Sequence, residues 1–268
     1  MSLSHEKDAF VAKVSHDLRQ PLNAIFLQVE ALRLSDLDEE QSQDVDRIHA
    51  HAARELNLVN DILEYQKIIM GAETLSKDEI DVSSLLNDLQ NTFAAEAKQK
   101  GLSFVNSGSD TLPSIIADDR RVRQVLGNLI GNSIKFTKKG TVTLDARPRE
   151  INDTSWVEFT VSDTGRGMSP EEQANAFVPF VSNKKDNAGG SGLGLSICKE
   201  LISQMGGRIG FFSEVDKGTH FSIFLPREPV SEHYESREAA ENMISLISPS
   251  SSNGESPIPR DATILVID

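Results

Sequence analysis

Two long amphipathic stretches at the start of the chain constrain its fold most strongly. In residues 6–33 the apolar residues recur in steps of three and four, at Val11, Val14, Leu18, Leu22, Ile25, Val29 and Leu32. Residues 39–69 repeat the pattern at Val45, Ile48, Ala52, Leu56, Val59, Ile62 and Leu63. This spacing puts one apolar stripe on one face of each helix. The short acidic connection between the stretches predicts an antiparallel helical hairpin.

A hairpin of two helices has too little interior to bury both stripes by itself. A homodimer, in which two hairpins form a four-helix bundle, solves this most simply. We therefore predict a dimerisation domain at residues 1–70.

From Gly71 onward the pattern becomes a mixture of helices and short strands. Helices are predicted near residues 82–100, 119–137 and 194–205, and the strand-like runs are LSFVN, SIIAD, TVTLDAR, WVEFTVSD, RIGFFSE and HFSIFLP. This mixture is typical of an α/β domain with a helix layer on a sheet. We place a hinge at residues 71–79 and this second domain at residues 80–227.

The remaining residues read as a linker and a short strand. Residues 228–261 are rich in Ser, Pro and Glu, which predicts a flexible linker with one helical turn near residues 239–247. The final run ATILVID, residues 262–268, has the pattern of a strand and reads as the truncated beginning of another element.

Composition limits the partners and the compartment. Asp and Glu outnumber Lys and Arg by 41 to 27, a net charge of -14, which disfavours nucleic acid and anionic membranes and makes any phosphate site local. No apolar run reaches the roughly 18 to 20 residues that span a bilayer, and no signal peptide precedes the first helix. The lone cysteine, Cys198, excludes an internal disulfide. We expect a soluble, cytoplasmic chain, although the parent protein could carry a membrane anchor outside this sequence.

The segment SHDLRQPLNAI, residues 15–25, places a histidine and a proline inside the first helix. His16 lies about 160° from the centre of the apolar stripe, so it is expected to face solvent. Pro21 has no N–H group, which predicts a kink. Asp17 is placed to orient the imidazole. These neighbours favour a nucleophilic histidine over an ordinary surface histidine.

A second segment, residues 118–140, sets Asn128, Asn132 and Lys135 at i, i+4 and i+7 on one helix face. Amide oxygens can bind Mg²⁺ and a lysine can bind phosphate, so this face favours nucleotide binding. The alternative is a plain polar helix face.

Two glycine-rich segments follow. In VSDTGRGMS, residues 161–169, Asp163 ends a strand before Gly165 and Gly167, which suits a carboxylate that accepts a hydrogen bond from an exocyclic amine; the alternative is a simple turn. In GGSGLGLSICKEL, residues 189–201, glycines lead into a helix whose N-terminus favours phosphate. The stretch FVPFVSNKKDNA between them predicts a mobile lid, or alternatively an ordinary surface loop.

Taken in order, SHDLRQPL, NLIGNSIKFT, DTGRGM, FVPF and GGSGLGL closely resemble the H, N, G1, F and G2 boxes of two-component sensor histidine kinases, over about residues 6–227. The resemblance implies a dimerisation and phosphoacceptor hairpin followed by an ATP-binding α/β sandwich of the Bergerat type, which type II topoisomerases and mismatch-repair ATPases share.

The resemblance also implies roles for individual residues, with ATP and Mg²⁺ as cofactors. His16 would be the phosphoacceptor and Asp17 its orienting base. Asn132 would bind Mg²⁺ with Asn128 beside it, and Lys135 would meet phosphate. Asp163 would hold the adenine amine. The other residues implied for the pocket and lid are Phe136, Gly165, Gly167, Phe177, Gly190, Gly192, Leu193 and Gly194.

The implied reaction is autophosphorylation of His16 from Mg-ATP, then transfer of the phosphoryl group to an aspartate on a receiver domain or response regulator. ATILVID resembles the first strand of a receiver domain, which suggests the core of a hybrid kinase in a phosphorelay. Two alternatives stay open: an ATP-binding signalling scaffold without kinase activity, and a Bergerat-type ATP hydrolase.

Two positions discriminate among these activities. The related topoisomerases carry a water-activating glutamate at the position of Asn128, and an amide cannot act as that base, so phosphotransfer is favoured over hydrolysis. Many sensor kinases carry Thr or Asn at the position of Gln20, where that residue serves to dephosphorylate the partner regulator. Gln20 therefore puts phosphatase activity in doubt.

Overall fold

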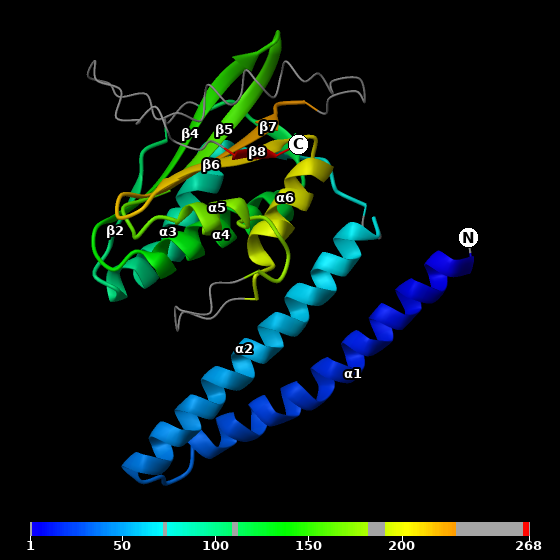
Figure 1. Cartoon of the computed structure of the whole chain (residues 1–268), viewed down its shortest axis with the longest axis vertical. Helices are drawn as coiled ribbons and strands as arrows, with labels where there is room; N and C mark the ends of the chain where they lie inside the picture. Colours follow the sequence, from blue (N-terminus) through cyan, green and yellow to red (C-terminus); the bar gives the residue numbers. More distant parts are fainter. Residues whose placement is uncertain (1, 72–73, 109–111, 182–190, 229–264, 268) are drawn as a thin grey trace. The chain divides into compact units, whose positions relative to one another are not determined.

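The computed structural model describes residues 2–71, 74–108, 112–181, 191–228 and 265–267, and side chains within residues 17–228 of these ranges (Figure 1). The chain divides into two compact units. The first comprises Met1–Thr74 with Pro179–Gly194, and the second comprises Leu75–Val178 with Leu195–Asp268.

The first unit is built on the predicted helical hairpin. Helix α1 covers Ser2–Arg33 and helix α2 covers Glu39–Ile69. Helix α1 continues through Pro21, so the proline expected to kink the helix does not end it. Helix α2 begins with a capping box, in which Asp38 and Gln41 each accept a hydrogen bond from the other's backbone N–H.

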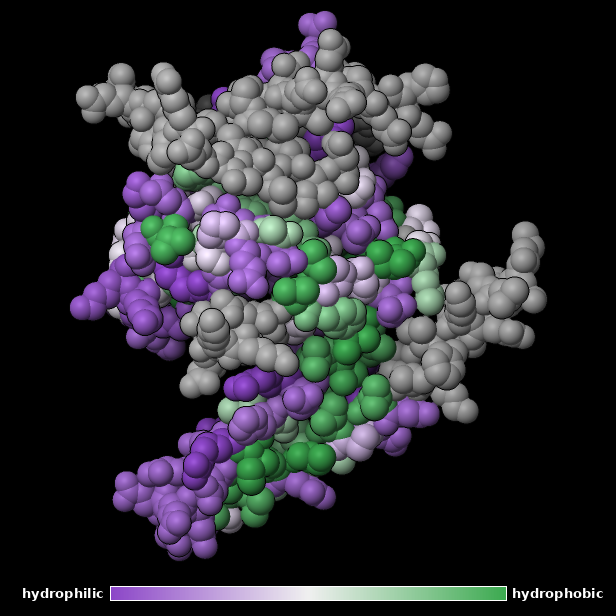
Figure 2. Space-filling view, in the orientation of Figure 1, coloured by the Kyte–Doolittle hydropathy of each residue, from purple (hydrophilic) through white to green (hydrophobic). Residues whose placement is uncertain are grey.

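The hairpin buries only part of its apolar stripe. Val29, Val45, Ala52 and Leu63 of the predicted stripe are buried. Other members of the predicted stripe remain open, with exposures of 47% for Leu18, 44% for Ile25, 48% for Leu32 and 49% for Ile48. Figure 2 shows apolar residues running along the hairpin. An open apolar face of this kind is typical of an interaction surface.

The second unit contains a mixed sheet of six strands in the order β2-β4-β5-β7-β6-β8. The neighbours are antiparallel except β2 and β4, which are parallel. The strands are β2 Ser103–Asn106, β4 Thr141–Ile151, β5 Thr154–Asp163, β6 Arg208–Glu214, β7 Gly218–Pro226 and β8 Leu265–Ile267.

Two further strands, β1 Asp78–Ile80 and β3 Ile115–Ala117, form a separate antiparallel pair. Strand β1 begins within the stretch predicted as a hinge. Sequence patterning missed it because its three residues, Asp-Glu-Ile, carry almost no strand signal. The predicted linker lies almost wholly in residues 229–264, outside the described residues, as does its predicted helical turn.

Helices cover one face of the sheet (Figure 1). They are α3 Val82–Gln99, α4 Asp119–Phe136, α5 Pro170–Ala174 and α6 Gly194–Gln204. Alternate residues of the central strands face them, among them Val157, Phe159 and Val161 of β5, each at most 1% exposed. The expected helix layer on a sheet is confirmed. Only the five-residue α5 lacked a sequence prediction, because it is too short for a periodic pattern.

Candidate functional site

Helix α4 carries the first group of predicted site residues. Asn128, Asn132 and Lys135 are half-buried, whereas Val125 and Leu129 of the same helix are at most 1% exposed. The helix therefore packs its apolar side into the unit and keeps its polar side partly open. The two amides and the lysine, predicted to share one face of this helix, are all on its partly open side.

Phe136 at the end of α4 has two cationic groups close to its ring. The Lys135 ammonium is 5.0 Å from the ring centroid of Phe136, and the Arg166 guanidinium is 5.3 Å from it. Arg166 also forms an ion pair with Glu172 at 2.7 Å. Positive charge thus gathers beside a flat ring, where the face of the ring attracts it.

Asp163 ends β5 on the face that carries the helices. Its Oδ1 accepts hydrogen bonds from the backbone N–H groups of Gly165, at 2.9 Å, and Thr219, at 3.3 Å. Its Oδ2 accepts one from the hydroxyl of Ser133 on α4, at 3.1 Å. Burial raises the pKa of Asp163 above its ordinary value, and the three hydrogen bonds oppose that rise.

The glycines after Asp163 are required by close backbone contacts. Gly167 has φ +63°, and a Cβ atom there would lie 1.9 Å from the carbonyl oxygen of Glu214. A Cβ atom at Gly165 would lie 2.8 Å from the carbonyl oxygen of Phe136. The Asp216 N–H donates to the carbonyl of Arg166 at 2.7 Å. The loop therefore packs directly on the backbone of the β6–β7 hairpin.

Sequence reasoning missed the residues of β6, β7 and α4 whose hydrogen bonds support this loop. The Ser213 hydroxyl accepts a hydrogen bond from the Met168 N–H at 2.9 Å, and it lies 2.9 Å from the Thr219 hydroxyl. Ser133, the third missed residue, contacts Asp163 directly. Serine and threonine on a strand or helix are too common to be noticed without the partner that they contact.

The two phenylalanines of FVPF have different environments. Phe177 is 7% exposed, and its ring centroid lies 5.7 Å from that of Phe211 in the core. Phe180 is 57% exposed and has φ +64°. Its N–H donates to the carbonyl of Gly192 at 3.0 Å, and its ring meets that of Tyr65 edge-on at 6.4 Å within the first unit. Phe177 thus belongs to the core, while Phe180 stands at the surface.

The glycine-rich segment before α6 is described from Ser191 onward, and Gly190 lies outside the described residues. Gly192 has φ +69°, and a Cβ atom there would lie 3.0 Å from the backbone of Phe180 and Val181. Leu193 is fully buried, and Gly194 begins α6. The segment therefore packs closely on the backbone of Phe180 and Val181 and leads directly into the N-terminus of α6.

The predicted phosphoacceptor segment lies in α1. The structure places His16 on this helix, and its side chain is outside the described residues; Asp17 and Gln20 are exposed. Arg19 donates two hydrogen bonds to Asn60 Oδ1 on α2, at 3.0 and 3.2 Å. His16 belongs to the first unit, whereas Asn132 and Asp163 belong to the second.

The described residues contain neither a cluster of metal ligands nor a membrane-spanning helix. Across these ranges no group of three or more His, Cys, Asp or Glu side chains could hold a metal ion. Likewise, none of the described helices is both long and apolar enough to cross a membrane.

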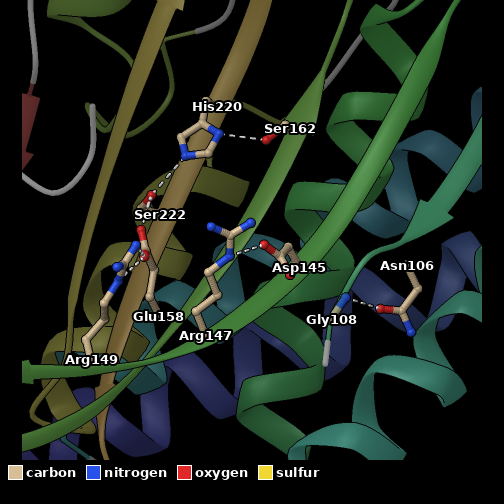
Figure 3. Close-up of polar contacts among 9 residues, drawn as sticks. All are labelled: Asn106, Gly108, Asp145, Arg147, Arg149, Glu158, Ser162, His220 and Ser222. Carbon is tan, nitrogen blue, oxygen red and sulfur yellow. Dashed lines mark hydrogen bonds and ion pairs between the residues drawn. The ribbon is translucent and has the colours of Figure 1, made fainter. Parts of the chain in front are cut away.

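The opposite face of the sheet carries a separate polar network (Figure 3). The His220 ring lies between the hydroxyls of Ser162, 2.6 Å from Nδ1, and Ser222, 3.3 Å from Nε2. Ser222 also donates to Glu158 at 3.1 Å, and Glu158 pairs with Arg149 at 2.6 Å. Because side chains alternate along β5, Ser162 and Asp163 point to opposite faces, and this network is distinct from the one around Asp163.

Family models match both parts of the chain. Residues 6–71 match the His Kinase A (phospho-acceptor) domain, and residues 117–229 match the histidine kinase-, DNA gyrase B- and HSP90-like ATPase domain. The two matches cover the helical hairpin and most of the second unit.

Curated relatives and solved structures agree with these matches. The aerobic respiration control sensor protein ArcB of Escherichia coli K12 is 35% identical over 234 residues, covering 85% of this chain and 30% of the relative. The sensor histidine kinase GacS of Pseudomonas protegens is 35% identical over 84% of this chain and 25% of its own length. The structure of full-length ShkA in complex with AMPPNP has a TM-score of 0.71 and 34% identity, covering 83% of this chain and 46% of that one. The chain thus spans less than a third of these curated relatives.

Proposed function

This chain belongs to the sensor histidine kinases, and from that premise we propose that it is a kinase core that phosphorylates its own His16 from Mg-ATP and passes the phosphoryl group to a receiver-domain aspartate. The observation that carries the proposal is the Asp163 site. Its carboxylate is half-buried and held by three donors, and among the described residues it keeps an acceptor position on Oδ2 for an exocyclic amine.

The residues around Asp163 fit a nucleotide. A Cβ atom at Gly165 would lie 2.8 Å from Asp163 Oδ1, so the glycine keeps a side chain away from that carboxylate oxygen. Lys135 and Arg166 bring positive charge beside Phe136, as an anionic phosphate chain requires. The amide of Asn132, on the open side of α4, would supply an oxygen ligand to Mg²⁺, and Asn128 would lie beside it. When bound, Mg²⁺ would neutralise charge on the phosphates.

The proposed reaction forms a bond between an imidazole nitrogen of His16 and the γ-phosphorus as the bond from that phosphorus to the ADP oxygen breaks. Asp17 would hold the imidazole proton and so keep the attacking nitrogen unprotonated. Lys135 would oppose the charge that develops on the transferred group. In a second step the phosphoryl group would move from the imidazole to a carboxylate of a receiver domain or response regulator.

The open stripe of the hairpin supports a homodimer. Leu18, Ile25 and Ile48 are each more than 40% exposed although their spacing marks them as interior positions. A second hairpin placed against them would complete a four-helix bundle. We also propose that this core acts in the cytoplasm, since a chain with a single cysteine, Cys198, suits a reducing compartment.

Incubation with γ-labelled ATP tests the proposal. The wild-type chain is expected to gain label that resists alkali and is lost in acid, as a phosphohistidine does, and His16→Gln is expected to gain none. His51→Gln is the matched control, because His51 is an exposed histidine on α2. Label retained by His16→Gln would refute His16 as the acceptor. Bound ATP with no label would indicate a scaffold, and free phosphate without labelled protein would indicate a hydrolase.

A further inference from the structure

Ser133 stands out because its side chain is one of the donors that hold Asp163. It is 2% exposed and lies on α4 between the predicted magnesium ligand Asn132 and the buried Ile134. A serine inside a helix commonly turns its hydroxyl back to a carbonyl of the preceding turn. Here the hydroxyl instead donates to Asp163 Oδ2, across the gap between α4 and β5.

The three hydrogen bonds are distributed unequally over the two carboxylate oxygens of Asp163. An ionised carboxylate offers about two acceptor positions on each oxygen. Gly165 and Thr219 fill both positions on Oδ1, and Ser133 fills one on Oδ2. Among the described residues, one acceptor position on Oδ2 therefore remains unfilled. Because the Ser133 hydroxyl occupies the other position on Oδ2, it determines the direction in which the remaining one points.

We propose that Ser133 is a positioning residue that keeps Asp163 an ionised acceptor with a single open position, and thereby makes the site select adenine over guanine. This inference rests on the proposed nucleotide function. Adenine presents an amine N–H to that position, whereas guanine presents a carbonyl oxygen, which an ionised carboxylate repels. A protonated Asp163 would instead donate a hydrogen bond to the guanine carbonyl oxygen.

Ser133 is the donor that a substitution can remove. The groups of Gly165 and Thr219 are backbone N–H groups, which remain whatever the side chain. Burial favours the protonated form of Asp163 and raises its pKa, and the Ser133 hydrogen bond lowers it. Without that hydroxyl, the protonation equilibrium of Asp163 shifts toward the neutral carboxyl group. The orientation of its Oδ2 is then also less restricted.

The charged side chains on the neighbouring elements contact groups other than the Asp163 carboxylate. On α4 the Lys135 ammonium lies 5.0 Å from the Phe136 ring centroid, and on the loop Arg166 pairs with Glu172. On the β6–β7 hairpin Lys217 pairs with Glu214, and the Asp216 N–H is bound to the Arg166 carbonyl. The described partners of the Asp163 carboxylate are the three uncharged donors.

The test compares dissociation constants of Mg-ATP and Mg-GTP for the wild-type chain, Ser133→Ala and Ser222→Ala, from about pH 8 to about pH 5.5. Ser222 is the matched control, since it is fully buried and donates to a carboxylate, that of Glu158, on the other face of the sheet. Ser133→Ala is expected to weaken ATP binding about ten-fold and to lower the ratio of ATP to GTP affinity, more so at the acidic end. Ser222→Ala is expected to leave that ratio unchanged.

The outcomes separate the inference from the proposed function. Unchanged ATP affinity in Ser133→Ala, or an equal loss for ATP and GTP at every pH, overturns the positioning role while His16 labelling in the wild type still supports the kinase. A wild-type chain that binds no adenine nucleotide overturns both. If Ser133→Ala does not fold, Ser133→Cys replaces it, because the thiol has similar size and is a weak donor, and the same drop in the ATP to GTP ratio is expected.

Discussion

The carboxylate of Asp118 joins two parts of the second unit that are far apart in sequence: Oδ2 accepts the Ser76 N–H at 3.1 Å, and Oδ1 accepts the Arg121 N–H at 3.0 Å. The first bond fixes the chain just before β1, and the second caps α4 at its N-terminus. Since α4 carries Asn128, Asn132 and Lys135, the segment that follows the helical hairpin is attached directly to the start of the proposed nucleotide-binding helix.

Replacing Asp118 with alanine is expected to lower the free energy of unfolding of the second unit by about 1 to 3 kcal/mol, because a helix cap and a buried hydrogen bond are lost together. Urea unfolding measures this. Asp118→Asn, which retains a capping oxygen, is expected to lose less than half as much, and equal losses for the two variants would contradict the capping role.

The pKa of Asp118 adds a pH dependence. Burial raises that pKa, but hydrogen bonds from Ser76 and Arg121 outweigh the rise and leave it below its ordinary value of 3.8. The ionised group therefore stabilises the fold at neutral pH, and this contribution is lost as the pH falls below 3.8 toward the folded-state pKa. In Asp118→Asn the acid limb of the stability profile is expected to be shallower.

Gly167→Ala is expected to disrupt the loop after β5, because its Cβ atom would lie 1.9 Å from the Glu214 carbonyl oxygen and its φ is +63°. A loss of about 2 kcal/mol or more in unfolding free energy should accompany loss of ATP binding. Gly127→Ala within α4 is the control, since its Cβ atom would make an ordinary 3.6 Å contact with Phe93. That change is expected to be neutral or to stabilise the helix by up to about 1 kcal/mol.

Asp163→Asn separates the stability of the site from its function. At neutral pH the wild type keeps a half-buried ionised carboxylate whose pKa is raised by partial burial. This is unfavourable for folding, so the contribution of this group to stability increases as the pH falls through the raised pKa. The amide removes that charge, so unfolding free energy should be unchanged or higher at neutral pH while ATP affinity drops at least about ten-fold. Calorimetry of binding and unfolding on one sample checks both, and a variant that still prefers ATP would contradict the assignment of Asp163.

His220 should make stability sensitive to mild acid. Burial lowers the pKa of His220 below its ordinary value of 6.5, although the carboxylates of Glu158 and Asp145 oppose this. The unfolded chain therefore takes up the proton first, and stability is expected to fall as the pH drops below 6.5. The melting temperature of His220→Gln should vary less between about pH 7.5 and pH 5.5 than that of the wild type. Parallel profiles would show that the ring is not the titrating group.

Dimerisation should depend on the open face of the hairpin. Ile25→Glu places a charge on a residue that is 44% exposed in the protomer, so the hairpin itself should fold while the bundle does not form. Light scattering is expected to show a monomer. Gln28→Glu, at a nearby exposed polar position, should remain dimeric, and a dimeric Ile25→Glu would place the interface elsewhere.

Sequence periodicity was sufficient for the long elements. The apolar stripe through Val45, Ala52 and Leu63 predicted α2 over residues 39–69, and the structure begins and ends it at Glu39 and Ile69. The alternation in WVEFTVSD likewise predicted β5 together with the position of Asp163 at its end. In β5 the residues that mark the pattern are also buried, whereas in α2 part of the stripe, such as Ile48, stays exposed.

Contacts across the fold were beyond the reach of sequence patterning. Ser133 and Thr219 meet at Asp163 from two elements, and their separation in the chain contains no signal of that meeting. Phe177, which belongs to the segment predicted as a lid, packs against Phe211 of the core, and the sequence contained no sign of this contact. Local propensity describes single elements, whereas these contacts depend on how the elements pair.

Side chains along β5 alternate between the two faces of the sheet, and this also determines where an inserted residue can be tolerated. Asp163 pairs with Val142 and Thr219, while Ser162 and Glu158 face the His220 network. One residue inserted between Thr154 and Asp163 would shift the strand by one position and exchange its two faces. Serine would then stand at the position of the proposed adenine acceptor, although every motif would still be present. An insertion at the turn of Asn152 and Asp153, whose φ values are 49° and 60°, would only enlarge the hairpin loop. The number of residues from that turn to Asp163 therefore determines which face of the sheet carries the carboxylate.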